Sequence, residues 1–102
     1  MNFKNTLQKG SFRRIIFKEG DTWYAVALEF NLVVSAVDPR VAMFELFEAV
    51  DGYLDSVKKS NSRPFALNQV TEKEYENMWT DLNEGKLVAS PFTVFDFGVT
   101  TI

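Results

Sequence analysis

The chain has 102 residues, with 14 acidic against 11 basic side chains and with neither cysteine nor histidine. This length suits one domain over residues 1–102, because single domains most often contain about 100–150 residues. With 46% apolar and 25% charged residues, the composition is that of a globular protein rather than of a disordered or membrane-spanning chain. The missing cysteine and histidine exclude disulfides, thiolate or imidazole metal sites, cysteine nucleophiles and histidine-based triads.

The charges are distributed unevenly along the chain. Residues 1–59 carry eight basic and eight acidic groups, whereas residues 60–102 carry three basic and six acidic groups. A surface that binds nucleic acid needs clustered Lys and Arg, so we expect no direct contact with nucleic acid. The first ten residues contain Lys4 and Lys9 without an apolar run behind them, which is not the pattern of a signal peptide or a membrane anchor. We therefore expect a cytoplasmic protein that does not bind membranes.

Three runs rich in β-branched and aromatic residues predict strands over residues 12–18, 22–29 and 32–37. A tight turn is expected between the first two strands, because Gly20 can adopt the positive φ that such a turn demands. The short connections predict a three-stranded antiparallel meander.

Apolar residues lie on both faces of the second predicted strand. Alternation along a strand places Tyr24, Val26 and Leu28 on one face. The other face then carries Trp23, Ala25 and Ala27. We therefore expect both faces of the sheet to be covered by other parts of the protein.

A helix is predicted from residue 39 to about residue 59. Asp38 can cap its free N–H groups, and Pro39 suits the first helical position. At 100° per residue, one broad apolar stripe forms, and we expect it to face the sheet. The stripe consists of Ala42, Met43, Leu46, Phe47, Ala49, Val50, Tyr53, Leu54 and Val57.

The second half of the chain predicts one more helix and one more strand. The stretch Lys58–Pro64 is a polar connector, in which Pro64 prevents the helix from continuing. The spacing of Thr71 and Glu74 is that of a capping box, and it predicts a second amphipathic helix over residues 72–84 that Gly85 ends. Its apolar face, which contains Tyr75, Met78, Trp79 and Leu82, either covers the second face of the sheet or docks on a neighbouring molecule. The tail predicts a late strand in which Phe92, Val94 and Asp96 alternate with Thr93, Phe95 and Phe97.

Carboxylates are the main catalytic candidates left, and a magnesium site would need several of them to converge. The candidates are Glu29, Glu45, Glu48 and Asp96. Acidic residues on the outer side of a helix usually face solvent, and Glu29 is expected to cap a turn. The five glycines stand alone, so no glycine-rich phosphate loop is present. We expect no catalytic residue, no metal and no cofactor.

Two adjacent arginines, Arg13 and Arg14, point to opposite faces of the first strand. No second basic pair joins them in the sequence. We therefore interpret both as surface side chains rather than as part of a nucleic-acid site.

Phe44 falls among the acidic residues of the predicted helix rather than on its apolar stripe. Single exposed apolar residues are common, and a small error in helix phase would place Phe44 in the core. Alternatively, Phe44 is the anchor of a protein interface inside an acidic rim, and Val41 would widen this patch. The sequence leaves both interpretations open.

Several features of the first half occur in a characteristic order. They are an aromatic-rich second strand, a turn over Glu29, Phe30, Asn31 and Leu32, Ala42 near the helix start, the pair Glu48 and Ala49, and then Tyr53 and Leu54. In this order the stretch Phe12–Val57, above all Trp23–Leu54, resembles the HicB-like antitoxin domain of type II toxin–antitoxin systems. The residues Ala36, Val37, Asp38 and Pro39 keep the family's helix cap but lack its usual glycine. Residues 60–102 resemble neither of the DNA-binding segments, helix-turn-helix or ribbon-helix-helix, that many HicB antitoxins carry.

The resemblance implies an α+β fold in which one main helix packs on a three-stranded antiparallel meander, described for the family as a partial RNase H-like fold without a working active site. The core of the resemblance is residues 12–57, and residues 65–102 form a helix-and-strand extension. It also implies a dimer and a small basic RNA-cleaving toxin of the HicA type as protein partner. The expected partner-binding residues are Phe44, Val41, Glu45, Glu48, Asp51 and Asp55. One alternative is a homo-oligomeric structural or regulatory domain with no toxin partner, and a further one is a magnesium-dependent nuclease.

Overall fold

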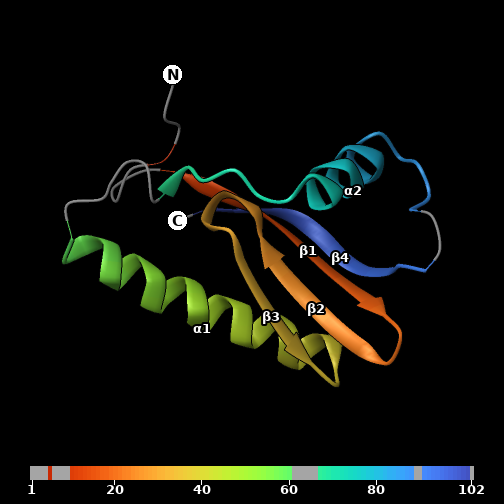
Figure 1. Ribbon diagram of the computed structural model, residues 1–102, viewed down its shortest axis with the longest axis horizontal. Helices are drawn as coiled ribbons and strands as arrows, with labels where there is room; N and C mark the ends of the chain where they lie inside the picture. Colours follow the sequence, from red (N-terminus) through yellow and green to blue (C-terminus); the bar gives the residue numbers. More distant parts are fainter. Residues whose placement is uncertain (1–4, 6–9, 61–66, 89–90, 102) are drawn as a thin grey trace.

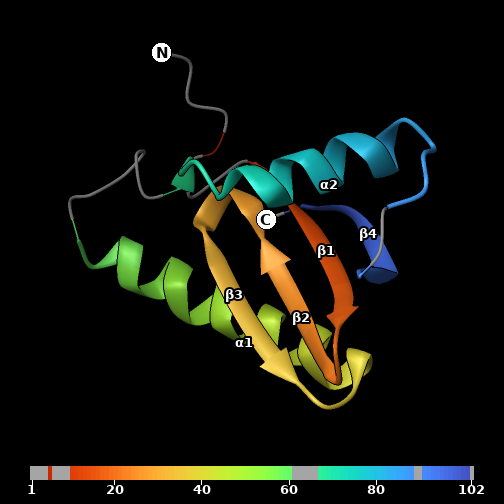
Figure 2. The same ribbon diagram turned by 45° about the vertical axis from the view of Figure 1, so that its right-hand side comes forward.

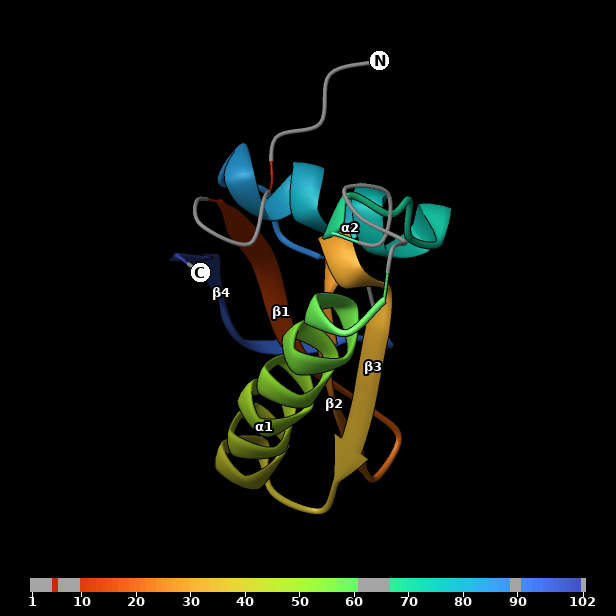
Figure 3. The same cartoon turned by 90° about the vertical axis from the view of Figure 1, so that its left-hand side faces the viewer.

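The computed structural model describes residues 5, 10–60, 67–88 and 91–101, and residues 61–64 of the predicted connector lie outside this part. Four strands form one sheet in the order β3-β2-β1-β4, and all neighbouring strands are antiparallel. The helices α1 and α2 lie on opposite faces of this sheet (Figure 1, Figure 3). The elements are β1 (Ser11–Glu19), β2 (Thr22–Ala27), a 3-10 turn (Leu28–Phe30), β3 (Leu32–Ala36), α1 (Pro39–Lys58), α2 (Lys73–Asn83) and β4 (Thr93–Thr101).

The predicted three-stranded meander is confirmed, with one difference at the end of the second strand. Gly20 has a φ of 64° in the turn between β1 and β2, as the sequence predicts. β2 ends at Ala27 instead of Glu29, because the chain forms a 3-10 turn before Asn31 adopts a left-handed conformation with a φ of 52°. An asparagine tolerates this conformation better than most residues, so the tight entry into β3 is encoded locally.

Both faces of the sheet are apolar and both are covered, as the alternation along β2 predicts. Trp23, Ala25 and Ala27 pack in the cluster under α1, whereas Tyr24, Val26 and Leu28 pack in the cluster under α2. Of the two roles predicted for the second helix, covering the second face of the sheet or docking on a neighbouring molecule, the structure shows the first. α2 packs on the sheet of its own chain.

The start and the core stripe of α1 are confirmed. The Asp38 side chain accepts hydrogen bonds from the N–H groups of Arg40 and Val41, at 2.8 and 3.4 Å, and Pro39 is the first helical residue. All nine predicted stripe residues are buried or half-buried, and Leu46 is completely buried. Phe44 is 63% exposed, so the predicted helix phase is correct and Phe44 is not a core residue.

The predicted capping box of the second helix is wrong. α2 begins at Lys73, its N-cap Glu72 makes no side-chain capping bond, and Thr71 is buried with its hydroxyl 3.4 Å from the amide oxygen of Asn31. The tertiary contact of Thr71 replaces the local cap. The end of α2 agrees with the sequence, because Gly85 has a φ of 75° and the Lys86 N–H donates to the carbonyl oxygen of Asp81 at 2.8 Å.

The predicted late strand exists as β4, but its alternation is wrong after Val94. A bulge breaks the register with β1, since Ile16 pairs with Asp96 whereas Phe17 pairs with Val94. Phe95 is the extra residue, and its ring contacts Trp23 on the α1 side of the sheet. Phe97 therefore lies on the α2 side, where its ring contacts Trp79. A bulge depends on strand pairing, so the sequence of β4 alone does not reveal it.

A single helix is too narrow to cover a whole face of this four-stranded sheet. A helix with its side chains is about 10 Å wide, whereas four strands spaced by about 4.8 Å put the outer strands about 14 Å apart. α1 packs mainly on β2 and β3. Figure 2 shows β4 at the edge of the sheet beyond β1, away from β3 and β2. The side of the sheet that ends in β4 is therefore the least covered part of the fold.

We predict that Phe30→Ala lowers the free energy of unfolding by about 3–5 kcal/mol, because Phe30 is 1% exposed and its ring lies between those of Phe12 and Tyr53. Phe47→Ala is the control: Phe47 is only half-buried, and we expect a loss of about 1–3 kcal/mol. Urea denaturation of both variants tests this. Equal losses would contradict the position of Phe30 at the centre of the core.

Candidate functional site

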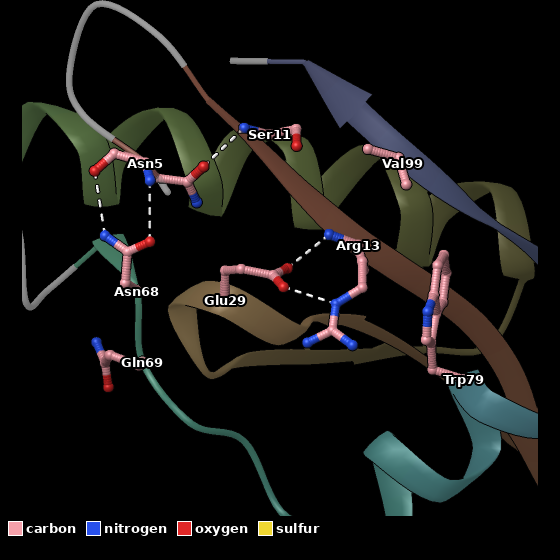
Figure 4. A pocket seen from close by; sticks show the side chains of 8 residues that line it. All are labelled: Asn5, Ser11, Arg13, Glu29, Asn68, Gln69, Trp79 and Val99. Carbon is pink, nitrogen blue, oxygen red and sulfur yellow. Dashed lines mark hydrogen bonds and ion pairs between the residues drawn. The ribbon is translucent and has the colours of Figure 1, made fainter. Parts of the chain in front are cut away.

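A polar pocket of about 530 Å³ opens on the α2 side of the sheet, where β1 and β4 meet the segment that leads into α2 (Figure 4). Four separate parts of the chain form it, so it exists only in the folded protein. Its lining residues are Asn5, Ser11, Arg13, Glu29, Asn68, Gln69, Trp79 and Val99.

Arg13 is held in this pocket by two carboxylates. Its backbone N–H and its Nε–H both donate to Glu29, each at 2.6 Å, and its two terminal nitrogens donate to the two oxygens of Glu76 on α2 at 2.7 and 2.8 Å. The hydrogen bonds with Glu76 raise the pKa of Arg13 despite its partial burial. Arg13 is thus a clamp between β1, the 3-10 turn and α2, and the interpretation of it as a surface side chain is wrong.

An aromatic wall completes this side of the pocket. The guanidinium carbon of Arg13 lies 5.7 Å from the centre of the Trp79 ring, and the Trp79 ring meets that of Phe97 nearly edge to face at 6.0 Å. Val99, opposite Arg13 in the register of β1 and β4, lines the same wall. A ligand here would meet apolar atoms on one side and amide and carboxylate groups on the other.

Asn5 joins the beginning of the chain to the segment before α2. Its side-chain amide donates to the carbonyl oxygen of Leu67, and its backbone exchanges two hydrogen bonds with the Asn68 side chain at 2.9 and 3.1 Å (Figure 4). Its amide oxygen also accepts from the N–H of Ser11. A Cβ atom on Gly10 would lie 2.3 Å from this oxygen, so only glycine fits there.

The charge balance limits what this pocket can bind. Arg13 is its one cation among the described residues, and Glu29 and Glu76 together exceed it by one negative charge. Because the donors of Arg13 are engaged by carboxylates, an anion such as phosphate would have to displace one of them. The pocket therefore disfavours anionic ligands, and its charged groups act mainly as structural links.

The outer face of α1 presents the residues that the sequence assigns to a partner. Phe44 and Val41, one turn apart, are 63% and 45% exposed. Glu45, Glu48, Asp51 and Asp55 are also exposed, and the stretch from residue 41 to residue 57 contains no basic residue. Of these acids, Asp55 pairs with Lys59 at 3.1 Å. The structure thus brings an exposed aromatic ring and a row of carboxylates onto one helix face.

An apolar groove of about 270 Å³ lies between α1 and the C-terminal part of β4. It exists because α1 sits over β2 and β3 and leaves a gap beside β4. The groove borders the acidic face at Asp51. Its lining residues are Phe12, Phe47, Val50, Asp51, Leu54, Thr100 and Thr101.

The sequence did not predict this groove. It placed Phe47, Val50 and Leu54 correctly on the core stripe but gave no position for β4. The sequence did contain one signal for the groove. The apolar stripe of the main helix is broader than its packing against a sheet requires.

The carboxylates considered for a magnesium site do not come together. Glu29 pairs with Arg13 on the α2 side of the sheet, whereas Asp96 pairs with Arg14 at 2.8 Å on the α1 side. Glu45 and Glu48 point into solvent from α1. In residues 5, 10–60, 67–88 and 91–101, no three acidic side chains are placed to hold a metal ion. Glu29 does not cap a turn as predicted; it binds Arg13 instead.

Arg14 is also an internal link rather than a free surface side chain. Its Nε donates to Asp96, and one terminal nitrogen donates to the Thr100 hydroxyl at 3.0 Å. The guanidinium lies over Gly98, where a Cβ atom would be 2.9 Å from it. The prediction that the two arginines point to opposite faces is confirmed, but their partners lie 16 to 86 positions away in the sequence, beyond the reach of any local pattern.

Comparison of the chain with models of protein families, with curated proteins and with solved structures finds no match. None of the helices in the described part is long and apolar enough to cross a membrane.

We predict that Glu29→Gln lowers the free energy of unfolding by about 1.5–3 kcal/mol, because it removes charged hydrogen bonds at a side chain that is only 21% exposed. Glu76→Gln breaks the same kind of pair at a more exposed position, and the loss there should be below about 1 kcal/mol. Urea denaturation at low and high salt measures both. A larger loss for Glu76→Gln would contradict the role of Glu29 as the buried half of the clamp.

Proposed function

We propose that this chain is a protein-binding module of the HicB-like antitoxin kind, which neutralises a small basic RNA-cleaving toxin by covering its surface. The observation that carries the proposal is the outer face of α1, where Phe44 is exposed among carboxylates. A central aromatic side chain ringed by charges is typical of interface anchors. The proposal also rests on the sequence resemblance of residues 12–57 to the HicB-like domain. That resemblance implies the partial RNase H-like fold of the family.

The electrostatics of the surface suit a basic partner. The acidic row of α1 has no basic residue between positions 41 and 57, so its field attracts cations over a distance of about one Debye length, 8–10 Å. A row of carboxylates can imitate the backbone of RNA, and a toxin that binds RNA must carry a complementary basic surface. The apolar groove beside Asp51 gives such a partner a place for one or two apolar side chains.

A homo-oligomeric domain without a toxin remains the alternative function. The observation that favours it is the uncovered strand β4, which offers a surface for a second copy. The two functions differ in one requirement, because only the antitoxin needs a basic protein partner.

The direct test is co-expression of the full chain with the short reading frame next to its gene. The proposal expects a small basic product that cleaves RNA alone, forms a stable complex with this chain and loses its RNase activity in the complex. A neighbouring product that is not basic, or that keeps its RNase activity in the presence of excess chain, would refute the proposal.

We predict that Phe44→Ala weakens this complex by more than about 1 kcal/mol, or about fivefold in Kd, because it removes the aromatic anchor. Its free energy of unfolding should change by less than about 0.5 kcal/mol, since the ring lies outside the core. Leu87→Ala removes another exposed apolar side chain, far along the chain, and should leave Kd unchanged. Calorimetric titration measures the Kd of both variants. Equal Kd values for Phe44→Ala and Leu87→Ala would show that Phe44 is not part of the interface.

We also predict that the double charge reversal Glu48→Lys, Asp51→Lys slows association at low salt by about tenfold or more and flattens its salt dependence, because long-range attraction mainly sets the rate of encounter. The control is Asp81→Lys, Glu84→Lys, which changes the net charge by the same amount at the end of α2. Stopped-flow association rates distinguish them. If both double variants slow association equally, net charge rather than the α1 surface steers the partner.

A further inference from the structure

β4 is a long edge strand whose protection against pairing is limited to one β-bulge near its N-terminal end. It runs for nine residues at the end of the sheet and, among the described residues, pairs with β1 on one side only (Figure 2). Edge strands of monomeric proteins are commonly blocked by lysine, by proline, by a β-bulge, by an inward-pointing charge or by being very short. The bulge at Phe95 lies before residues 96–101, which keep a regular register with β1. β4 contains neither lysine nor proline, and its single charged residue is Asp96.

The charge on Asp96 is neutralised within the chain. Arg14 binds the Asp96 carboxylate at 2.8 Å and the Thr100 hydroxyl at 3.0 Å, and its guanidinium lies flat over Gly98. The α1 side of β4 is therefore electrically neutral, although the whole chain carries a net charge of −3. Two copies of this edge can approach each other without bringing unpaired charges together.

Apolar side chains are exposed on both sides of β4. Phe97 and Val99, on the α2 side, are 41% and 57% exposed, and Phe95, on the α1 side, is 48% exposed. The bulge produces this arrangement, because it turns Phe95 to the face opposite Phe97. A partner that covers both faces of the edge at once must itself be part of a sheet.

The opposite edge of the sheet differs in length. β3 has only five residues and is followed closely by Asp38 and Pro39 at the start of α1. Val33 is exposed there to 45%, but α1 packs against the other face of β3. A short strand offers few hydrogen bonds to a neighbour, so β4 is the edge that is open to pairing.

We propose that two copies of this chain pair through β4, antiparallel and related by a two-fold axis near Phe97, to form one continuous eight-stranded sheet. An antiparallel strand pair related by such an axis is self-complementary, so the unpaired N–H and C=O groups on either side of the axis meet the same groups of the second copy. The inference rests on β4 and does not depend on the proposed toxin.

The exposed rings of β4 supply part of the area that a stable dimer needs. At roughly 200 Å² for a fully buried phenyl ring, the exposed parts of Phe95 and Phe97 in two copies amount to about 350 Å². Specific interfaces bury about 1,200–2,000 Å² in total, so the rings supply less than a third, and a stable dimer requires the rest from the other side chains and the backbone of the two nine-residue edges.

Pairing would also complete the apolar groove beside α1. This groove is lined by Thr100 and Thr101 at the C-terminal end of β4 and is open beyond them. In an antiparallel pair the N-terminal half of the partner's β4 lies next to this end. The two α1 helices would lie on the same face of the joined sheet, and the two grooves would face each other across the axis.

The first test compares two edges with the same substitution. The wild-type chain should sediment as a dimer at about 50 µM, a concentration that populates any dimer with a Kd of a few micromolar or less. Val99→Glu should raise the dimer Kd at least tenfold, because the carboxylate would be buried between the two edges, whereas in the monomer it lies opposite Arg13. Val33→Glu makes the same change on β3 and should leave the dimer intact. A wild-type monomer at this concentration, or dissociation by Val33→Glu alone, would overturn the proposal.

The second test uses the absence of cysteine from the chain. Single cysteines placed in turn at positions 95 to 99 should form an intermolecular disulfide at the residue nearest the axis, because opposite Cα atoms in an antiparallel pair are about 4.5–5.5 Å apart. A cysteine two positions from the axis is about 13 Å from its counterpart along the strands and should not cross-link. Ser35→Cys on β3 is the control. One sharp maximum within β4 supports the proposal, and uniform, absent or β3-centred cross-linking overturns it.

Discussion

The structure depends on a sheet that is apolar on both faces. Ile16 and Ala25 point toward α1, while Ile15 and Val26 point toward α2, and all four are completely buried. The described part of the chain has one long helix and one shorter helix to cover these two faces. Because each helix is narrower than four strands, the cover is incomplete on the side that ends in β4. The apolar groove and the exposed rings of Phe95 and Phe97 follow from this mismatch, and they lie beside an edge that the open sheet leaves unpaired.

The two neighbouring arginines hold α2 and β4 against β1. Arg13 ties β1 to Glu29 and to α2, and Arg14 ties β1 to β4 through Asp96. Each link is partly shielded from water, which makes it stronger than an ion pair on an open surface. Strand alternation sends the two side chains to opposite faces, so one dipeptide attaches both late elements of the chain to the early meander.

The sequence predicts what is decided by local patterns. Alternation along β2, the Asp38 cap and the outward position of Phe44 all follow from neighbouring residues, and the structure contains each of them. Prediction from the sequence fails where the local structure is determined by a residue that is distant in the sequence. Thr71 looks like a helix cap but bonds Asn31, and β4 changes its alternation at a bulge that exists only in the pair with β1.

The three candidate surfaces also differ in how far the sequence predicts them. The acidic face of α1 lies within one helix, so its composition could be read from the sequence, although its partner could not. The polar pocket and the groove each need residues from β1 and β4 together, and their assembly depends on tertiary pairing.

The β4 side of the sheet is the part that the helices cover least, and in the proposed dimer it forms the contact with the second copy. Hydrogen exchange of the full chain, measured by mass spectrometry at two protein concentrations, tests it most directly. The account predicts that amide protection of residues 93–101 rises with concentration, while the protection of β3 and of the buried side of α1 stays constant. Protection of β4 that is independent of concentration, with changes at β3 instead, would contradict it.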